Sequence, residues 1–274
     1  MIDREDYEEP NCPFCTDAYE KKPVSKIPTD RIARKADAFF GKNDYGSAEK
    51  LYLFWLGEAK DGNDAGGEFF IRNELMGLYR KTGRKDEAIF CAEEALRLAA
   101  ASGSENTLSA ATAYINIGTV FKAFGMPEKA LPHFEKAERI YRENLRGDDA
   151  RLGGLYNNYA LALADIKRYA EAREKYRKAV SVMKKIENGE PETAITLLNL
   201  ADLAEREYGA ENGAEEIERC VKEAEKLILS PSVPKDGNYA FVCEKCAPVF
   251  GYYGFFATQR ELEETAKRIY DERS

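Results

Sequence analysis

Apolar positions recur along the chain at spacings that belong to helices. In one stretch, two large residues precede a small one and a third large residue follows, at Tyr114, Ile117, Gly118 and Phe121. The next stretch has a small residue, an aromatic one and another small residue, at Ala130, Phe134 and Ala137. Each spacing places its residues on one stripe of an α-helix. The pattern predicts two closely packed helices, because small residues let helices approach and aromatic rings fill the spaces between turns.

The same pattern returns forty-two residues later, at Tyr156, Tyr159, Ala160 and Leu163, and then at Ala172, Tyr176 and Ala179. It also extends in both directions. The small residue that opens each second helix is in turn Ala48, Ala88, Ala130, Ala172 and, after a one-residue slip, Ala214. Such a constant period predicts a repeat array. We expect six antiparallel helix pairs, over residues 29–65, 66–104, 107–147, 149–188, 191–229 and 237–274, with turn residues such as Gly125 inside each pair.

This arrangement resembles the tetratricopeptide repeat, whose pattern is W-x2-L-G-x2-Y followed by A-x3-F. The resemblance covers about residues 29–274. The family's period is 34 residues, and long second helices such as 171–186 would absorb the eight extra residues. Units of 42 residues are similar to those of kinesin light chains and of bacterial peptide-sensing regulators, both of which bind peptides in a groove. The resemblance implies an all-α fold, a right-handed α-solenoid whose first helices line a concave surface.

Two segments lie outside the repeats. Residues 1–28 contain four prolines and no helical period, so we expect an extended or partly disordered leader. A proline-containing loop over residues 230–238 precedes the last pair. Thr29 and Asp30 are expected to cap the first helix, because their side chains can accept hydrogen bonds from its first N–H groups.

A polar position recurs in the first helices, two residues before the small one. From the first unit to the last it holds Arg34, Glu74, Asn116, Asn158, Asn199 and Lys245. We call Asn116, Asn158 and Asn199 the asparagine row. An amide side chain both donates and accepts hydrogen bonds, so the row is suited to hold the backbone of an extended peptide on the concave side. Neighbouring residues would add further amides and positive charge, namely Asn73, Asn157, Arg80, Lys122 and Arg206. The alternative is that these asparagines have a structural role and that any binding surface lies elsewhere.

Two Cys-x2-Cys pairs, Cys12 with Cys15 and Cys243 with Cys246, raise a second hypothesis. Four thiolates suit tetrahedral zinc, and the leader pair has the form Cys-Pro-x-Cys, so a zinc- or thiol-dependent sensor is the alternative function. However, Cys243 and Cys246 occupy the two large positions of the last first helix, where cysteine usually packs as a small apolar residue. We therefore expect core packing for that pair, and no bound cofactor.

The remaining chemistry is sparse. The only histidine, His133, lies in a second helix beside Phe134 and is expected to be a surface or satisfied residue. No phosphate-binding loop, nucleophile elbow or zinc-protease motif occurs, so we predict that the protein is not an enzyme. In the aromatic run from Phe250 to Phe256, the repeat register places Phe250 in the core, but the other four aromatic residues cannot all be buried on one stripe. We expect them to pack the last helix pair, or else to form a surface for a partner or for a second copy of the chain.

Charge narrows the range of partners. The chain has 41 basic and 49 acidic residues, a net charge of −8, and no block of Lys or Arg. We therefore expect a protein or an extended peptide as the partner and no nucleic acid, whose binding depends on neutralised phosphates. No apolar run reaches the length of about 20 residues that a membrane helix needs. The acidic first ten residues differ from a secretory signal, and we expect a cytoplasmic protein.

Overall fold

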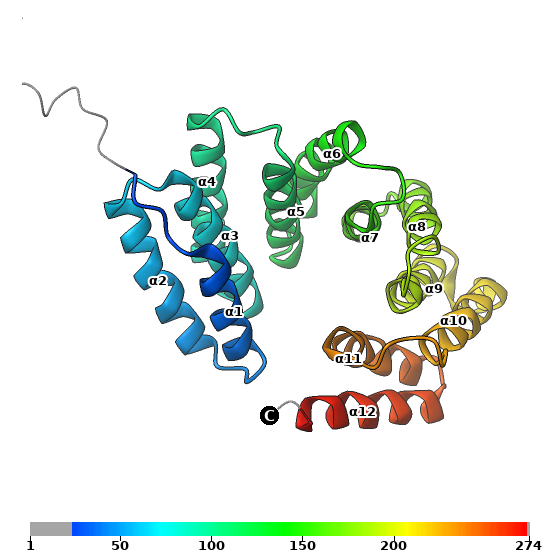
Figure 1. Ribbon diagram of the computed structural model, residues 1–274. Helices are drawn as coiled ribbons and strands as arrows, with labels where there is room; N and C mark the ends of the chain where they lie inside the picture. The colour runs from blue at the N-terminus through cyan, green and yellow to red at the C-terminus, as the bar shows by residue number, and fades with distance from the viewer. Residues whose placement is uncertain (1–23, 273–274) are drawn as a thin grey trace, which may run out of the picture.

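The computed structural model describes residues 24–272, which form twelve α-helices (Figure 1). Their bounds are α1 Thr29–Phe40, α2 Tyr45–Asp61, α3 Ala65–Lys81, α4 Lys85–Ala101, α5 Leu108–Ala123, α6 Pro127–Asn144, α7 Ala150–Asp165, α8 Tyr169–Met183, α9 Glu190–Asn212, α10 Ala214–Ile228, α11 Gly237–Tyr252 and α12 Phe256–Asp271. No helix in this part of the chain is both long and apolar enough to cross a bilayer.

The helices form six consecutive pairs that stack into an arc. Within each pair, the first helix packs against the second. The first helices α3, α5, α7, α9 and α11 also contact one another in succession. Figure 1 shows the odd-numbered helices on the inner side of the arc and the even-numbered helices along its outer side. We call the surface of the odd-numbered helices the inner face. The predicted all-α solenoid of helix pairs is confirmed.

Small residues hold the two helices of a pair together. Ala48, Ala88, Ala130 and Ala172 have no exposed surface, as their repeated position predicts. In the third pair the two helices approach closely, since a Cβ atom on Gly118 would lie 2.7 Å from the ring of Phe134. Phe134 is itself fully buried, so the ring fills the space that the glycine leaves.

One residue in the left-handed region lets the chain turn inside each pair. These residues are Asn43, Gly83, Gly125, Lys167, Gly209 and Gly254, and their φ angles lie between +54 and +85 degrees. Glycine adopts this region without steric cost, and asparagine tolerates it. Lys167, between α7 and α8, is the exception to this preference, because it is neither glycine nor asparagine and still has a φ of +63 degrees.

The fifth pair corrects the predicted register. Ala214 is exposed, whereas Gly213 is buried and occupies the position equivalent to Ala172. A Cβ atom on Gly213 would lie 3.1 Å from the carbonyl oxygen of Ala204, so only glycine fits without a shift. With Gly213 in that place the predicted slip disappears, because Gly213 follows Ala201 by 12 residues, as Ala172 follows Ala160. The helix α9 is interrupted by Gly209 at φ +81 degrees.

Two local expectations were also wrong. The expected long helix over residues 171–186 is α8, which has 15 residues, whereas α6 has 18 and α3 and α4 have 17 each. The additional residues of each unit are therefore shared between both helices and their loops. At the start of α1, Pro28 is the N-cap residue and no side chain caps the helix, so Thr29 and Asp30 do not act as predicted.

The segment before α1 is extended and fastened to the turn between α2 and α3. The N–H of Ser25 donates to the carbonyl oxygen of Gly62 at 2.9 Å. The N–H of Ile27 donates to Asp64 Oδ2, also at 2.9 Å, and the other oxygen of Asp64 caps α3 through the N–H of Gly67. Residues 24–28 therefore lie against the first two helix pairs.

Candidate functional site

The asparagine row lies on three successive first helices, α5, α7 and α9, and all three side chains are half-buried. Asn116 donates from Nδ2 to Asn73 Oδ1 at 3.0 Å, and Asn199 donates from Nδ2 to Asn157 Oδ1 at 3.0 Å. The predicted neighbours Asn73 and Asn157 are thus the hydrogen-bond partners of the row, one repeat earlier in the chain.

Asn158 behaves differently from the other two members of the row. Its Nδ2 donates at 2.9 Å to the carbonyl oxygen of Gly154, four residues earlier in the same helix. Ile115 stands in α5 where α3 and α7 have Asn73 and Asn157, so no amide faces Asn158 from that position. Within residues 24–272, the side-chain oxygens of Asn116, Asn158 and Asn199 accept no hydrogen bond.

Two of the basic residues predicted to add positive charge, Lys122 and Arg206, form ion pairs with carboxylates. Lys122 Nζ lies 3.7 Å from Asp165 Oδ2, and Arg206 NH1 lies 3.2 Å from Asp165 Oδ1. Arg206 also pairs through Nε with Asp202 Oδ2 at 2.7 Å. These contacts link the ends of α5, α7 and α9, and they leave little net positive charge there.

Arg80 and Lys245 remain available. The guanidinium of Arg80, near the end of α3, forms no ion pair or hydrogen bond with any residue of the described range, and desolvation lowers its pKa. Lys245 of α11 is exposed, with Nζ 5.5 Å from the ring centroid of Phe241. Phe241 is 48% exposed, so this end of the inner face presents an aromatic ring and a cation together.

A hollow of about 840 Å³ opens between the extended segment 24–28 and the starts of α3 and α5. Phe70, Asn73, Glu74 and Thr112 are among its lining residues. Burial raises the pKa of Glu74, and this carboxyl accepts a hydrogen bond from the hydroxyl of Tyr52 at 3.1 Å. Asn73, the hydrogen-bond partner of Asn116, therefore lies at the edge of a cavity large enough for several residues of a peptide.

Cys243 and Cys246 pack in the core, with exposed fractions of 0% and 1%. Burial raises the pKa of both thiols, that of Cys246 to about 12, and so disfavours the thiolates that zinc needs. Residues 24–272 contain no cluster of three or more groups that could hold a metal ion. Cys12 and Cys15 lie outside the described residues.

His133 is stacked between two aromatic rings. Its ring centroid lies 6.1 Å from that of Tyr114 and 5.5 Å from that of Phe121, and the rings are nearly parallel. Burial and, to a smaller extent, Lys136 lower the pKa of His133, which favours the neutral imidazole. Among the residues that the structure describes, no nucleophile is hydrogen-bonded to His133, which packs between helices α5 and α6.

The C-terminal aromatic run is divided between core and surface. Phe250 is fully buried, as its repeat position predicts, whereas Tyr252 and Phe256 are 70% and 65% exposed. The hydroxyls of Tyr252 and Tyr253 donate to the two carboxylate oxygens of Glu205, at 2.7 and 3.0 Å. The sequence analysis missed this contact.

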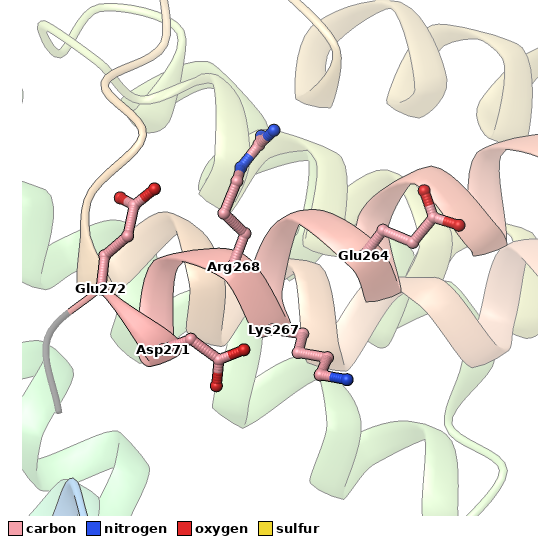
Figure 2. Close-up of a pocket in the computed structure, with 5 residues that line it drawn as sticks. All are labelled: Glu264, Lys267, Arg268, Asp271 and Glu272. Carbon is pink, nitrogen blue, oxygen red and sulfur yellow. The ribbon is translucent and has the colours of Figure 1, made fainter.

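A shallow hollow of about 380 Å³ on α12 is lined by charged side chains alone (Figure 2). They are Glu264, Lys267, Arg268, Asp271 and Glu272. Figure 2 shows Lys267 and Asp271 pointing to one side of the helix and Arg268 and Glu264 to the other. The side chains do not converge on one point, so this surface holds no site.

Two of the contacts that the sequence analysis did not predict, those of Asn116 and of Arg206, share one signal. The partners Asn73 and Asn116 are 43 residues apart, and Asp165 and Arg206 are 41 apart. Both separations are close to one repeat. Equivalent positions on adjacent first helices are neighbours in a solenoid, so pairs of complementary residues one period apart would have predicted these contacts.

Solved structures with the same architecture include BtubC (BKLC) of P. vanneervenii, which is 25% identical over 72% of this chain and 78% of its own, with a TM-score of 0.64. A kinesin light chain-like protein of P. anserina with nearly identical TPR-like repeats is 18% identical over 74% of this chain and 95% of its own, with a TM-score of 0.50. No curated protein sequence matches the chain.

A model of the tetratricopeptide repeat matches residues 71–143 and 151–223, which together exceed half of the 274 residues. These segments contain α5 to α8 and most of the helices on either side, including the whole asparagine row. The buried small residues Ala88, Ala130 and Ala172 also lie within the matched segments, and the chain belongs to the tetratricopeptide repeat family.

Proposed function

We propose that the inner face binds an extended segment of a partner protein and that the asparagine row holds the backbone of that segment. The fold supports the general part of the proposal, because tetratricopeptide repeats generally form non-enzymatic scaffolds for protein interactions. The cavity of about 840 Å³ beside Asn73 supplies room at one end of the inner face. Arg80, which no described carboxylate neutralises, supplies positive charge at the other end of α3.

The observation that carries the proposal is the hydrogen bonding of the side-chain amides of the asparagine row. The hydrogen bonds from Asn116 to Asn73 and from Asn199 to Asn157 fix these side chains, and the bond from Asn158 to Gly154 fixes the third. The three side-chain oxygens are left to accept hydrogen bonds from a ligand. Because the side chains are already ordered, binding would cost little rotamer entropy.

The same pairs also support a structural role, and Asn158 separates the two interpretations. Its amide bonds only to its own helix, so its removal breaks no contact between helices. We expect Asn158→Ala to weaken peptide binding about tenfold, the value of one well-placed hydrogen bond, without a large change in the urea midpoint. The probes are twelve-residue peptides selected from a random phage-displayed library, and the measurement is fluorescence anisotropy.

Asn144→Ala is the matched control. Asn144 also donates to the carbonyl oxygen four residues earlier, Ile140, at 2.9 Å, but it lies at the end of α6, a second helix. Peptide affinity is expected to survive this substitution. If the selected peptides bind Asn158→Ala as tightly as the native chain, or if the library yields no binder, the proposal is wrong.

A further inference from the structure

The junction between the fifth and sixth pairs contains a second recess. The last pair contacts the preceding pair chiefly through α11 and α9. Between α10 and the turn from α11 to α12 lies a cleft of about 550 Å³. Figure 1 shows the turn from α11 to α12 beside α10. The cleft is separate from the asparagine row, none of whose members lines it.

The walls of the cleft are apolar and aromatic, with carboxylates at the edge. Ile217 and Val221 of α10 and Phe255 of the turn form the apolar part, and Tyr252, Tyr253 and Glu205 also line the cleft. The two tyrosine rings are 4.9 Å apart at an interplanar angle of 79 degrees. Such a recess accommodates a side chain that has an aliphatic stem and a polar end.

Glu205 has no positive partner among residues 24–272. Within this range, the only hydrogen bonds to the carboxylate of Glu205 come from the hydroxyls of Tyr252 and Tyr253. The hydrogen bond to Glu205 is the main cause of the raised pKa of Tyr252, and burial is the main cause for Tyr253. The other charge that acts on both hydroxyls is Asp202, which is also negative. Glu218, on the rim, pairs with Lys222.

The same grouping occurs elsewhere in the chain with an arginine included. The hydroxyl of Tyr79 donates to Glu49 at 3.0 Å, and Arg84 NH1 donates to the same carboxylate at 2.6 Å. The guanidinium of Arg84 also lies over the ring of Tyr79, 4.4 Å from its centroid. A tyrosine and a glutamate in contact thus hold an arginine by an ion pair and a cation–π contact in this molecule.

We propose that the cleft between α10 and the α11–α12 turn binds an arginine side chain of a partner polypeptide. The guanidinium pairs with Glu205 and stacks on a tyrosine ring, and the aliphatic stem and an adjoining leucine-like residue lie on Ile217 and Val221. Arginine fits better than lysine because its planar group can stack and make two parallel hydrogen bonds to one carboxylate. The net charge of −8 favours the approach of a basic segment.

The test is an NMR titration of the 15N-labelled full chain with acetyl-Leu-Arg-amide and with its citrulline counterpart, which has nearly the same shape and no charge. We expect the arginine peptide to shift the backbone amide signals of Glu205, Tyr252 and Tyr253. The citrulline peptide should bind about tenfold more weakly, as expected for the loss of one partly exposed ion pair and one cation–π contact.

Glu205→Gln should weaken the binding of the arginine peptide to a similar extent. Glu135→Gln is the matched control, because Glu135 likewise accepts from a tyrosine hydroxyl, that of Tyr159 at 3.2 Å, but lies outside the cleft. Equal binding of the two peptides, shifts confined to other residues, or no shifts at all would each overturn the proposal. The comparison of the peptides needs no variant, so it stands even if Glu205→Gln fails to fold.

The result is independent of the peptide-binding proposal for the inner face. Asn158→Ala should leave the titration of the cleft unchanged, since Asn158 does not line it. Conversely, failure of the arginine peptide to bind the cleft leaves the asparagine row untested by this experiment and open to the phage-derived peptides.

Discussion

At the scale of single residues, His133 couples stability to pH. Burial between Tyr114 and Phe121 lowers its pKa below the 6.5 of a free histidine. The folded state therefore binds a proton less readily than the unfolded state. A depressed histidine pKa contributes full stability above pH 6.5, and this stability is lost as the pH falls below that value. The chain has no other histidine, so the effect is not mixed with that of a second imidazole.

We predict that lowering the pH from about 7.5 to about 5.5 destabilises the native chain more than the variant His133→Phe. The phenylalanine ring keeps the stacking and cannot be protonated. The difference can reach at most about 1.4 kcal/mol per pH unit. Urea unfolding at the two pH values measures it, and an NMR titration of the histidine ring gives the folded-state pKa directly. A folded-state pKa at or above 6.5 would contradict the prediction.

At the scale of helices, the close approach of α5 and α6 depends on one missing side-chain atom. A Cβ on Gly118 would lie 2.7 Å from the ring of Phe134, which is fully buried. We predict that Gly118→Ala destabilises the chain by about 1–3 kcal/mol through overpacking. Gly77→Ala is the control, because its Cβ would meet nothing within 4 Å in α3.

Gly77→Ala should instead stabilise the chain by about 0.5–1 kcal/mol, the usual gain when alanine replaces glycine inside a helix. Both variants are compared by urea unfolding. Equal effects of the two substitutions would show that the small positions reflect helix propensity and not the distance between helices.

The helices themselves follow from sequence wherever a side chain marks the register. Ala130, Ala172 and their aromatic partners predict the pairs correctly, because each fills a defined place between two helices. Gly213 was not identified because the next residue, Ala214, is also small and was assigned to the repeat position. The spacing distinguishes the two residues, since Ala201 and Gly213 are 12 residues apart, as are Ala160 and Ala172.

The candidate site was less predictable than the helices. The repeat register places Asn116, Asn158 and Asn199 on three successive first helices, but it does not say which groups they bond. Lys122 and Arg206 look like free cations in sequence, because their partner Asp165 lies one repeat away from each. A solenoid brings together residues that only its period relates, and the choice among them depends on side-chain reach.

At the scale of the whole molecule, stability should vary along the solenoid. Each pair is stabilised by its neighbours, so a pair with contacts on both sides opens less readily than one with contacts on a single side. The pair α11–α12 is joined to the rest mainly through α9. Cys243 and Cys246 are buried in it, whereas Cys91 is buried in α4, between the first and third pairs.

We predict that the thiols of Cys243 and Cys246 become reactive at lower urea than that of Cys91, and on the order of tenfold faster below the main transition. All three are protonated and buried in the native state, so their alkylation requires opening of the helices around them. Pulsed alkylation and mass spectrometry of a chain carrying Cys12→Ser and Cys15→Ser measure each site. Simultaneous exposure of all the thiols would mean that the six pairs unfold as one cooperative unit. Earlier exposure of Cys91 would place the weakest contact at the other end, so the order of labelling decides where the solenoid opens first.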